Sequence, residues 1–102
     1  MTRTVSQLLE QSGLTKNELG RFNLPLKGIS RIKIDVGLSL DAPHAMSWLK
    51  ADPELLVIGF EPVEDCVRSI RKLLAGEDMV QIRSRFIIIQ CALSADSGVA
   101  RF

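Results

Sequence analysis

Three segments with the pattern of β-strands, separated by two stretches of helical periodicity, constrain the fold of this chain more than any other feature. Residues 55–60 are apolar throughout, which is typical of a strand buried on both faces of a parallel sheet. Residues 31–37, which alternate between charged and apolar side chains at first, and residues 86–91 are the other two segments, and both contain several β-branched side chains. Strands that alternate with helices in this way predict a parallel sheet with helical crossover connections.

Both intervening stretches carry helix signals. Pro43 suits the first turn of a helix because the N–H that it lacks would be unpaired there, and Asp41 is close enough to cap that turn. This helix is expected to continue to about Lys50. A second helix is expected over residues 63–75, where apolar side chains recur at helical spacing before Gly76. The side chains expected to face inward are Ala45, Met46, Leu49, Val63, Cys66, Val67, Ile70, Leu73 and Leu74.

The chain before the first strand is expected to be helical in two short pieces. Thr4 and Gln7 have the spacing of a capping box, which predicts a helix at that point. Residues 15–18 repeat the pattern and predict another short helix, followed by an extended linker. We therefore divide the chain into an N-terminal helical segment with a linker over residues 1–28 and a core domain over residues 29–102.

The fold class that these elements indicate is α/β. We expect a Rossmann-like three-layer sandwich, as a truncated half with parallel strands in the order 3-2-1 and flanking helices, preceded by the short helical N-terminal segment. A chain of 102 residues has room for one such core and not for two ordinary domains.

Composition and charge exclude several classes of function. A net charge of +1 provides no long-range field to attract a polyanion, so nucleic acid is not an expected partner. No apolar run approaches the roughly 20 residues that span a bilayer, and no signal-peptide pattern opens the chain, so we expect a cytoplasmic protein without a membrane partner. Cys66 and Cys91 lack metal-ligand spacing and are expected to be reduced core residues, and no metal site is expected.

The candidate ligand site lies where the first two strands end. Ligands of doubly wound sheets bind beyond the carboxyl ends of the strands, where the loops separate and helix N-termini present their amides. Glu61 ends the second strand a little more than 20 residues after Gly37, near the spacing at which dinucleotide-binding folds place a carboxylate on ribose hydroxyls. Gly37 would allow close backbone approach to a ligand. Asp35 ends an otherwise apolar strand, where an unpaired carboxylate is costly.

Each of these three residues also has a purely structural interpretation. Gly37 can serve a simple turn from strand to helix, and Glu61 can stabilise the N-terminus of the helix that follows it. Asp35 can bond to its own loop instead of to the amine of a ligand. Among other polar residues, we expect His44 on the surface or in a capping role, and Arg83 with Arg85 at a solvated entry to the third strand.

A family resemblance rests on three motifs in order. Residues 34–37 read Ile-Asp-Val-Gly, residues 57–62 read Val-Ile-Gly-Phe-Glu-Pro, and residues 91–98 begin Cys-Ala-Leu-Ser. Together they resemble the FkbM family of S-adenosylmethionine-dependent methyltransferases, over roughly two thirds of the chain. Leu38 and Asp41 stand where the family loop has Ala and Gly.

The resemblance implies a cofactor and the residues that bind it. In the family, the acid-x-Gly loop wraps the methionine part of S-adenosylmethionine, and the Glu of Phe-Glu-Pro binds the ribose. Those roles would fall on Asp35 with Gly37 and on Glu61, with the stretch 92–93 near the adenine. Ser39 stands where the family has Asn and keeps some hydrogen-bonding capacity. The expected cofactor-binding residues are Asp35, Gly37, Ser39, Glu61, Ala92 and Leu93.

Three functions remain open at this point. The first is the cofactor-binding portion of an FkbM-like O-methyltransferase, not active alone, because the family's remaining strands, acceptor pocket and catalytic base are not among these residues and no catalytic residue can be named. The second is a non-enzymatic remnant that forms homo-oligomers through an open sheet edge. The third is a dinucleotide-binding half-domain, which the absence of Gly-x-Gly-x-x-Gly after the first strand disfavours.

Overall fold

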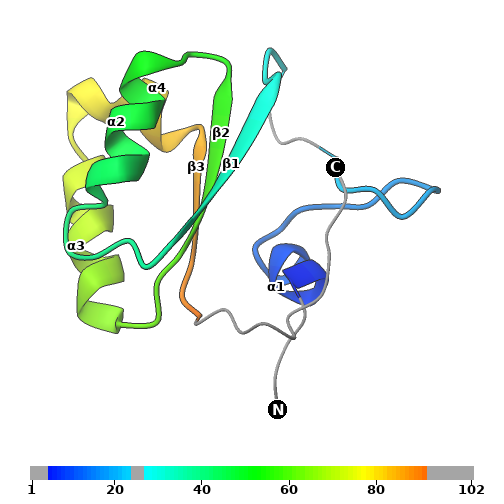
Figure 1. Ribbon diagram of the computed structural model, residues 1–102, viewed down its shortest axis with the longest axis horizontal. Helices are drawn as coiled ribbons and strands as arrows, with labels where there is room; N and C mark the ends of the chain where they lie inside the picture. Colours follow the sequence, from blue (N-terminus) through cyan, green and yellow to red (C-terminus); the bar gives the residue numbers. More distant parts are fainter. Residues whose placement is uncertain (1–4, 24–26, 92–102) are drawn as a thin grey trace.

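A computed structural model describes residues 5–23 and 27–91 of the chain. It has an α/β architecture with a three-stranded, all-parallel open sheet in which β2 lies between β1 and β3. Figure 1 shows α2, α3 and α4 on one face of the sheet and α1 on the other. The elements are α1 (Val5–Gln11), β1 (Arg31–Val36), α2 (Pro43–Ala51), β2 (Leu55–Phe60), α3 (Glu64–Leu74), a 3₁₀ turn (Glu77–Met79), α4 (Val80–Arg83) and β3 (Phe86–Ile89).

The pleat of β2 divides the core into two clusters, one on each face of the sheet. All six residues of β2 are buried, as the apolar run predicts. Alternate side chains of a strand point to opposite faces, so each face of β2 contributes to a different cluster. The helix-side cluster consists of Leu38, Ala42, Ala45, Leu49, Leu55, Val57, Ile70, Leu74, Ile82 and Phe86. The α1-side cluster consists of Leu8, Leu9, Leu14, Phe22, Leu56, Ile58, Phe60 and Ile89.

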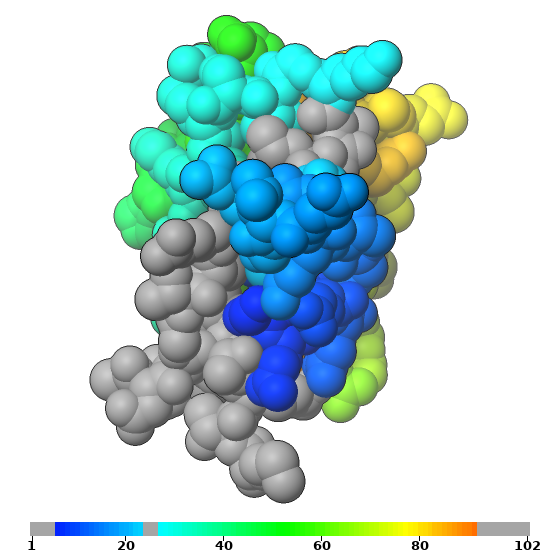
Figure 2. All heavy atoms as spheres, turned by 90° about the vertical axis from the view of Figure 1, so that its right-hand side faces the viewer, coloured from blue at the N-terminus to red at the C-terminus, as the bar shows by residue number. Residues whose placement is uncertain are grey.

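The residues after α1 correct one expectation. Residues 15–18 do not form a helix; Lys16 instead forms an isolated antiparallel bridge with Phe22. The Asn17 side chain accepts hydrogen bonds from the amides of Leu19 and Arg21, and this local bonding competes with helix formation. Figure 2, which views the molecule from this side, shows α1 and the segment after it in the middle of the surface. The capping Thr4 and much of the expected linker lie outside the described residues.

The helices on the other face differ from the sequence expectation in their details. Helix α2 starts after Ala42, whose φ is 47°, and no side chain caps it, so the capping role expected for Asp41 is wrong. Val63 and Leu73 are half exposed, although both were expected to face inward, because Val63 precedes α3 and Leu73 lies at the margin of its apolar stripe. The chain between α3 and β3 forms the 3₁₀ turn and α4, for which the periodicity gave no prediction.

Arg85 is buried, so the expected solvated entry to β3 is wrong at this position. Its guanidinium donates hydrogen bonds to the carbonyls of Leu49 at 3.0 Å, Asp52 at 2.8 Å and Leu55 at 3.0 Å. Leu49 lies in the last turn of α2, where carbonyls have no partner within the helix. Arg85 therefore ties the end of α2 to the start of β2, while Arg83 is exposed and bonds the carbonyl of Leu74.

Candidate functional site

The carboxyl ends of β1 and β2 lie side by side. Val36 is in register with Phe60, and the Gly37 amide donates a hydrogen bond to the Phe60 carbonyl at 2.8 Å. Glu61 follows Phe60 directly. The structure therefore brings Gly37 and Glu61 to one end of two neighbouring strands, at the lower end of the sheet in Figure 1.

The loop from β1 to α2 has a left-handed backbone at three positions. The φ angle is 78° at Gly37, 65° at Ser39 and 47° at Ala42. A Cβ at Gly37 would meet no atom within 4 Å, so glycine suits this position through its backbone conformation and not through a close neighbour. Ser39 and Ala42 carry a Cβ in the same region, at a cost of about 1–2 kcal/mol each. Contacts outside the loop must therefore hold it in place.

One such contact is made by Leu38. Its side chain is 1% exposed and lies over Gly59 in β2. A Cβ at Gly59 would approach Leu38 Cδ1 and Cδ2 to 2.7 Å and Phe86 Cε1 to 2.9 Å. Glycine in a strand permits this close approach, and Leu38 fills the space as a member of the helix-side cluster. The sequence carries two signals for this contact, an apolar residue in a loop and a glycine between bulky residues of a strand. The contact was not predicted from the sequence.

The second contact that holds the loop is the carboxylate of Glu61. Glu61 is 4% exposed, and its Oε1 accepts a hydrogen bond from the Ser39 amide at 2.8 Å while Oε2 accepts one from the Val63 amide at 3.0 Å. The side chain thus joins the loop after β1 to the loop after β2. A carboxylate has about four acceptor positions, so each oxygen retains a second one for a hydroxyl donor.

Asp35, near the end of β1, lies beside the first turn of α2 and has polar neighbours there. Burial raises the pKa of the Asp35 carboxyl, while the charge of His44 and a hydrogen bond from the Ala45 amide act in the opposite direction. Both neighbours belong to the first turn of α2, whose N-terminal amides favour a negative charge. His44 therefore has a carboxylate neighbour that the sequence pattern did not reveal.

The remaining candidate residues divide into two groups. Ser39 contributes its amide to Glu61, and its exposed side chain leaves the hydroxyl accessible to solvent. Ala92 and Leu93 lie outside the described residues. Four of the six candidates, Asp35, Gly37, Ser39 and Glu61, thus belong to two adjoining strand ends and the loops that follow them.

Cys66 lies close to this end of the sheet, in the first turns of α3. Burial raises the pKa of its thiol, and the negative charges of Glu61 and Asp65 raise it further. A raised pKa keeps the sulfur as a thiol, which is a poor nucleophile. Neither Cys66 nor Cys91 forms a disulfide, and both are half-buried.

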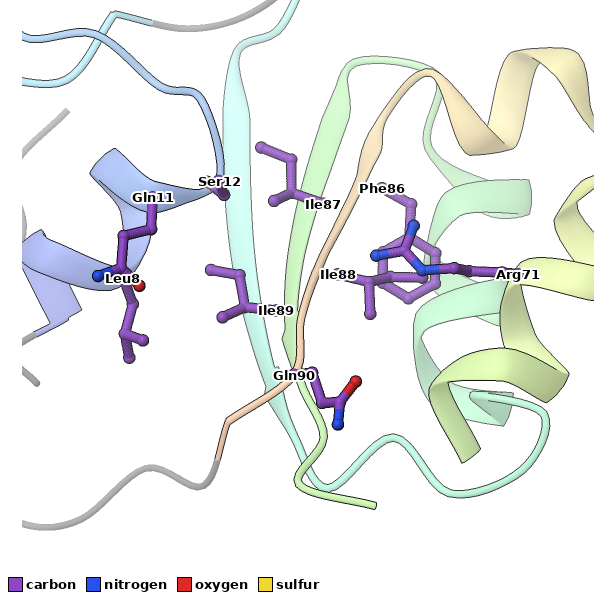
Figure 3. Close-up of a pocket in the computed structure, with 9 residues that line it drawn as sticks. All are labelled: Leu8, Gln11, Ser12, Arg71, Phe86, Ile87, Ile88, Ile89 and Gln90. Carbon is purple, nitrogen blue, oxygen red and sulfur yellow. The ribbon is translucent and has the colours of Figure 1, made fainter. Parts of the chain in front are cut away.

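A hollow of about 510 Å³ lies around β3, at the edge of the sheet opposite to β1. Figure 3 shows Ile87 and Ile89 directed toward α1, with Phe86 and Ile88 on the opposite side of the strand near Arg71. None of the candidate residues lines this hollow. The loops after β1 and β2, with their buried carboxylate and left-handed turn, therefore remain the candidate site.

The chemistry of the site is that of binding through hydrogen bonds. Within residues 5–23 and 27–91, no group of three His, Cys, Asp or Glu side chains has the geometry to hold a metal ion. In the same described ranges, no helix has the length and apolar character to cross a membrane. Comparisons of the chain with protein families, with curated proteins and with solved structures found no match.

Proposed function

We propose that this chain is the S-adenosylmethionine-binding portion of an FkbM-like O-methyltransferase, built on half of a Rossmann-like domain and without turnover of its own. The observation that carries the proposal is the position of Glu61. Glu61 directly follows β2, and its carboxylate lies beside the left-handed turn at Gly37. Doubly wound α/β folds bind dinucleotide or nucleoside cofactors at this end of the strands.

The roles of the residues follow from their chemistry. The free acceptor positions of Glu61 would receive the two ribose hydroxyls, and the bond to the Ser39 amide holds the carboxylate in place before the ligand arrives. Gly37 would lie against the methionine part of the ligand, because its turn exposes backbone without a side chain. Asp35 would pair with the methionine amino group, whose positive charge favours the ionised carboxylate.

When bound, S-adenosylmethionine would supply a methyl group on a sulfonium, and transfer to a hydroxyl would release S-adenosylhomocysteine. The described residues would bind and orient this cofactor, which is a contribution of positioning. No residue of the described part is assigned as the base that takes the hydroxyl proton. We therefore propose binding, and not methyl transfer, as the measurable property of this chain. A reducing, cytoplasmic location would suit its two free thiols.

Calorimetric titration with S-adenosylhomocysteine tests the proposal. The chain should bind it with one site, and Glu61→Ala should weaken binding by about tenfold or more, because a charge-assisted hydrogen bond contributes about 1.5–3 kcal/mol. Glu64→Ala is the matched control: its carboxylate is exposed, pairs with Arg68 and lies only three residues away. Circular dichroism verifies that each variant is folded.

The possible outcomes test the identity of the cofactor and the role of Glu61 separately. An absence of heat with all three proteins would exclude the cofactor. Equal affinity of the Glu61→Ala variant and the unaltered chain would exclude the role of Glu61. Tighter binding of NAD⁺ than of S-adenosylhomocysteine would favour the dinucleotide-binding half-domain instead.

A second candidate function is a self-associating, non-enzymatic module. It is favoured by β1, which is an edge strand among the described residues and whose Ile34 and Val36 are 51% and 58% exposed. An edge strand with exposed apolar side chains invites pairing with another strand. A stable oligomer that binds no cofactor would support this candidate over the first.

A further inference from the structure

We infer that two copies of this chain pair through the edge of β1 that faces away from β2, antiparallel and with the two-fold axis at Ile34. Such a pairing would join two three-stranded sheets into one continuous sheet. The inference gives a register to the self-association proposed above and rests on it, but it does not depend on the cofactor site.

The first step is the direction of the backbone groups of β1. The amides of Arg31 and Gly37 donate to the carbonyls of Glu54 and Phe60, on the β2 side. Backbone groups of a parallel strand point alternately to its two sides, so those of residues 32, 34 and 36 point away from β2. These groups form the edge that a further strand would meet. In an antiparallel pair, such outward residues must lie opposite each other.

The second step is the distribution of side chains on β1. Ile32, Ile34 and Val36 lie on the α1 face, where Ile32 packs against the α1-side cluster and the other two remain half exposed. Lys33 and Asp35 lie on the helix face: the Lys33 ammonium is 4.6 Å from the centre of the Trp48 ring, and Asp35 adjoins α2. The strand therefore carries apolar groups on one face and charges of both signs on the other.

The third step is the choice of register, which charge decides. With the axis at Ile34, Lys33 of each copy lies opposite Asp35 of the other, so opposite charges meet twice. Directly opposite residues of this kind interact most closely, since they belong to the pairs without backbone hydrogen bonds. On the α1 face, Ile34 meets its own copy and Val36 meets Ile32, so exposed apolar groups are covered.

Three of the four neighbouring registers place like charges opposite each other, and the fourth, with its axis at Val36, gives neither Lys33 nor Asp35 a charged partner in the other copy. An axis at Lys33 would set Lys33 against its own copy, and an axis at Asp35 would do the same with two carboxylates. An axis at Ile32 would set Arg31 against Lys33 twice. Like charges directly opposite are destabilising in a sheet. Arg31 is already paired with Asp52 within its own chain at 2.6 Å, so it needs no partner from the second copy.

Sedimentation equilibrium tests the association itself. The full chain should form a reversible particle of twice its 11.3 kDa mass. Ile34→Lys should weaken the dimer by about tenfold or more, because it replaces an apolar pair at the axis by two like charges. Val80→Lys is the matched control, since Val80 is 47% exposed and lies on α4. A monomer at all concentrations would overturn the inference, as would equal weakening by both substitutions.

Disulfide cross-linking tests the register, in a background with Cys66→Ser and Cys91→Ser. Ile34→Cys should yield a cross-linked dimer on mild oxidation, because facing residues of such a pair have Cα atoms about 5.5 Å apart, within disulfide range. Val36→Cys should not, because its two copies would be offset by four residues, about 13 Å along the strands. A dimer that cross-links through residue 36 as readily as through residue 34, or through neither, would leave self-association standing and overturn this register. Binding of S-adenosylhomocysteine is measured separately and bears only on the cofactor site.

Discussion

At the scale of single residues, the space above Gly59 is filled by Leu38, and this contact fixes the loop after β1. Gly59→Ala should destabilise the chain by about 1–3 kcal/mol, because the new methyl group would lie 2.7 Å from the Leu38 side chain. Urea unfolding measures this effect. On a Leu38→Ala background the same substitution should cost clearly less, because the two closest contacts are removed and only the one with Phe86 Cε1 at 2.9 Å remains. An equal cost on both backgrounds would contradict the contact.

Arg85 provides a second prediction at this scale. Arg85→Met should lower the free energy of unfolding by at least about 2 kcal/mol, since it leaves carbonyls at the end of α2 and the start of β2 without donors. Arg83→Met is the matched control and should cost less, because the Arg83 side chain is exposed. Thermal or urea unfolding of the two variants compares them. A larger loss for the Arg83 variant would show that the buried guanidinium is not the important one.

At the scale of elements, Arg31 and Asp52 join the start of β1 to the end of α2. The Arg31 guanidinium donates to Asp52 Oδ2 at 2.6 Å, and this hydrogen bond lowers the pKa of the Asp52 carboxyl from 3.8 to about 2. A pKa that is lower in the folded chain stabilises the fold above pH 3.8, and this contribution disappears as the pH falls to about 2.

The prediction concerns the pH dependence of stability. Asp52→Asn should have a lower melting temperature than the unaltered chain near neutral pH, and the gap should close as the pH falls through the range from 3.8 to about 2. Melting temperatures recorded across that range measure the gap. A gap that stays constant down to pH 2 would mean that the carboxylate charge does not matter.

Glu61 connects two loops, and its loss should be visible in both. Glu61→Gln keeps the shape of the side chain but turns one acceptor oxygen into a donor, which cannot bond to an amide N–H. Hydrogen exchange at the Ser39 and Val63 amides should therefore become faster in at least one of the two loops, with a loss of stability of about 1–3 kcal/mol. Exchange rates at Leu49, in the last turn of α2, serve as the internal control. Unchanged exchange at both loop amides would contradict the connection.

At the scale of the whole molecule, the two faces of the sheet share β2 and should unfold together. Leu9 is 1% exposed in the α1-side cluster, and Leu9→Ala should cost about 2–5 kcal/mol. Trp48, the only tryptophan, packs against the cluster on the opposite face. Its fluorescence and the far-ultraviolet circular dichroism should shift to lower denaturant by the same amount. A fluorescence transition that stays in place would show that residues 1–28 are an independent appendage.

Local patterns were enough to predict most of the architecture. The fully buried β2, the helix over residues 64–74 and the parallel sheet follow from apolar run length and helical periodicity, which report on burial within each element. The same patterns misjudged residues 15–18, where the Asn17 side chain bonds to nearby amides and displaces the helix. They gave no prediction for α4, which is only four residues long.

The candidate site was predictable in place but not in detail. Chain order and strand length bring Gly37 and Glu61 to the same edge, because the carboxyl ends of parallel strands meet there. The partners of their side chains depend on residues far apart in sequence: Glu61 with the Ser39 amide, and Leu38 with Gly59. A local sequence pattern carries no information about such long-range contacts.

By itself, the sequence determined where the three strands and the helices α1, α2 and α3 lie, since hydrophobic periodicity and strand propensity act over a few residues. Only the tertiary structure decided the environment of each charge. It buried Arg85 against backbone carbonyls, placed His44 beside Asp35 and, among the described residues, left β1 at the edge of the sheet. The physical reason is that desolvation and hydrogen bonding depend on which elements pack together, and this becomes defined only when the sheet and its helices assemble.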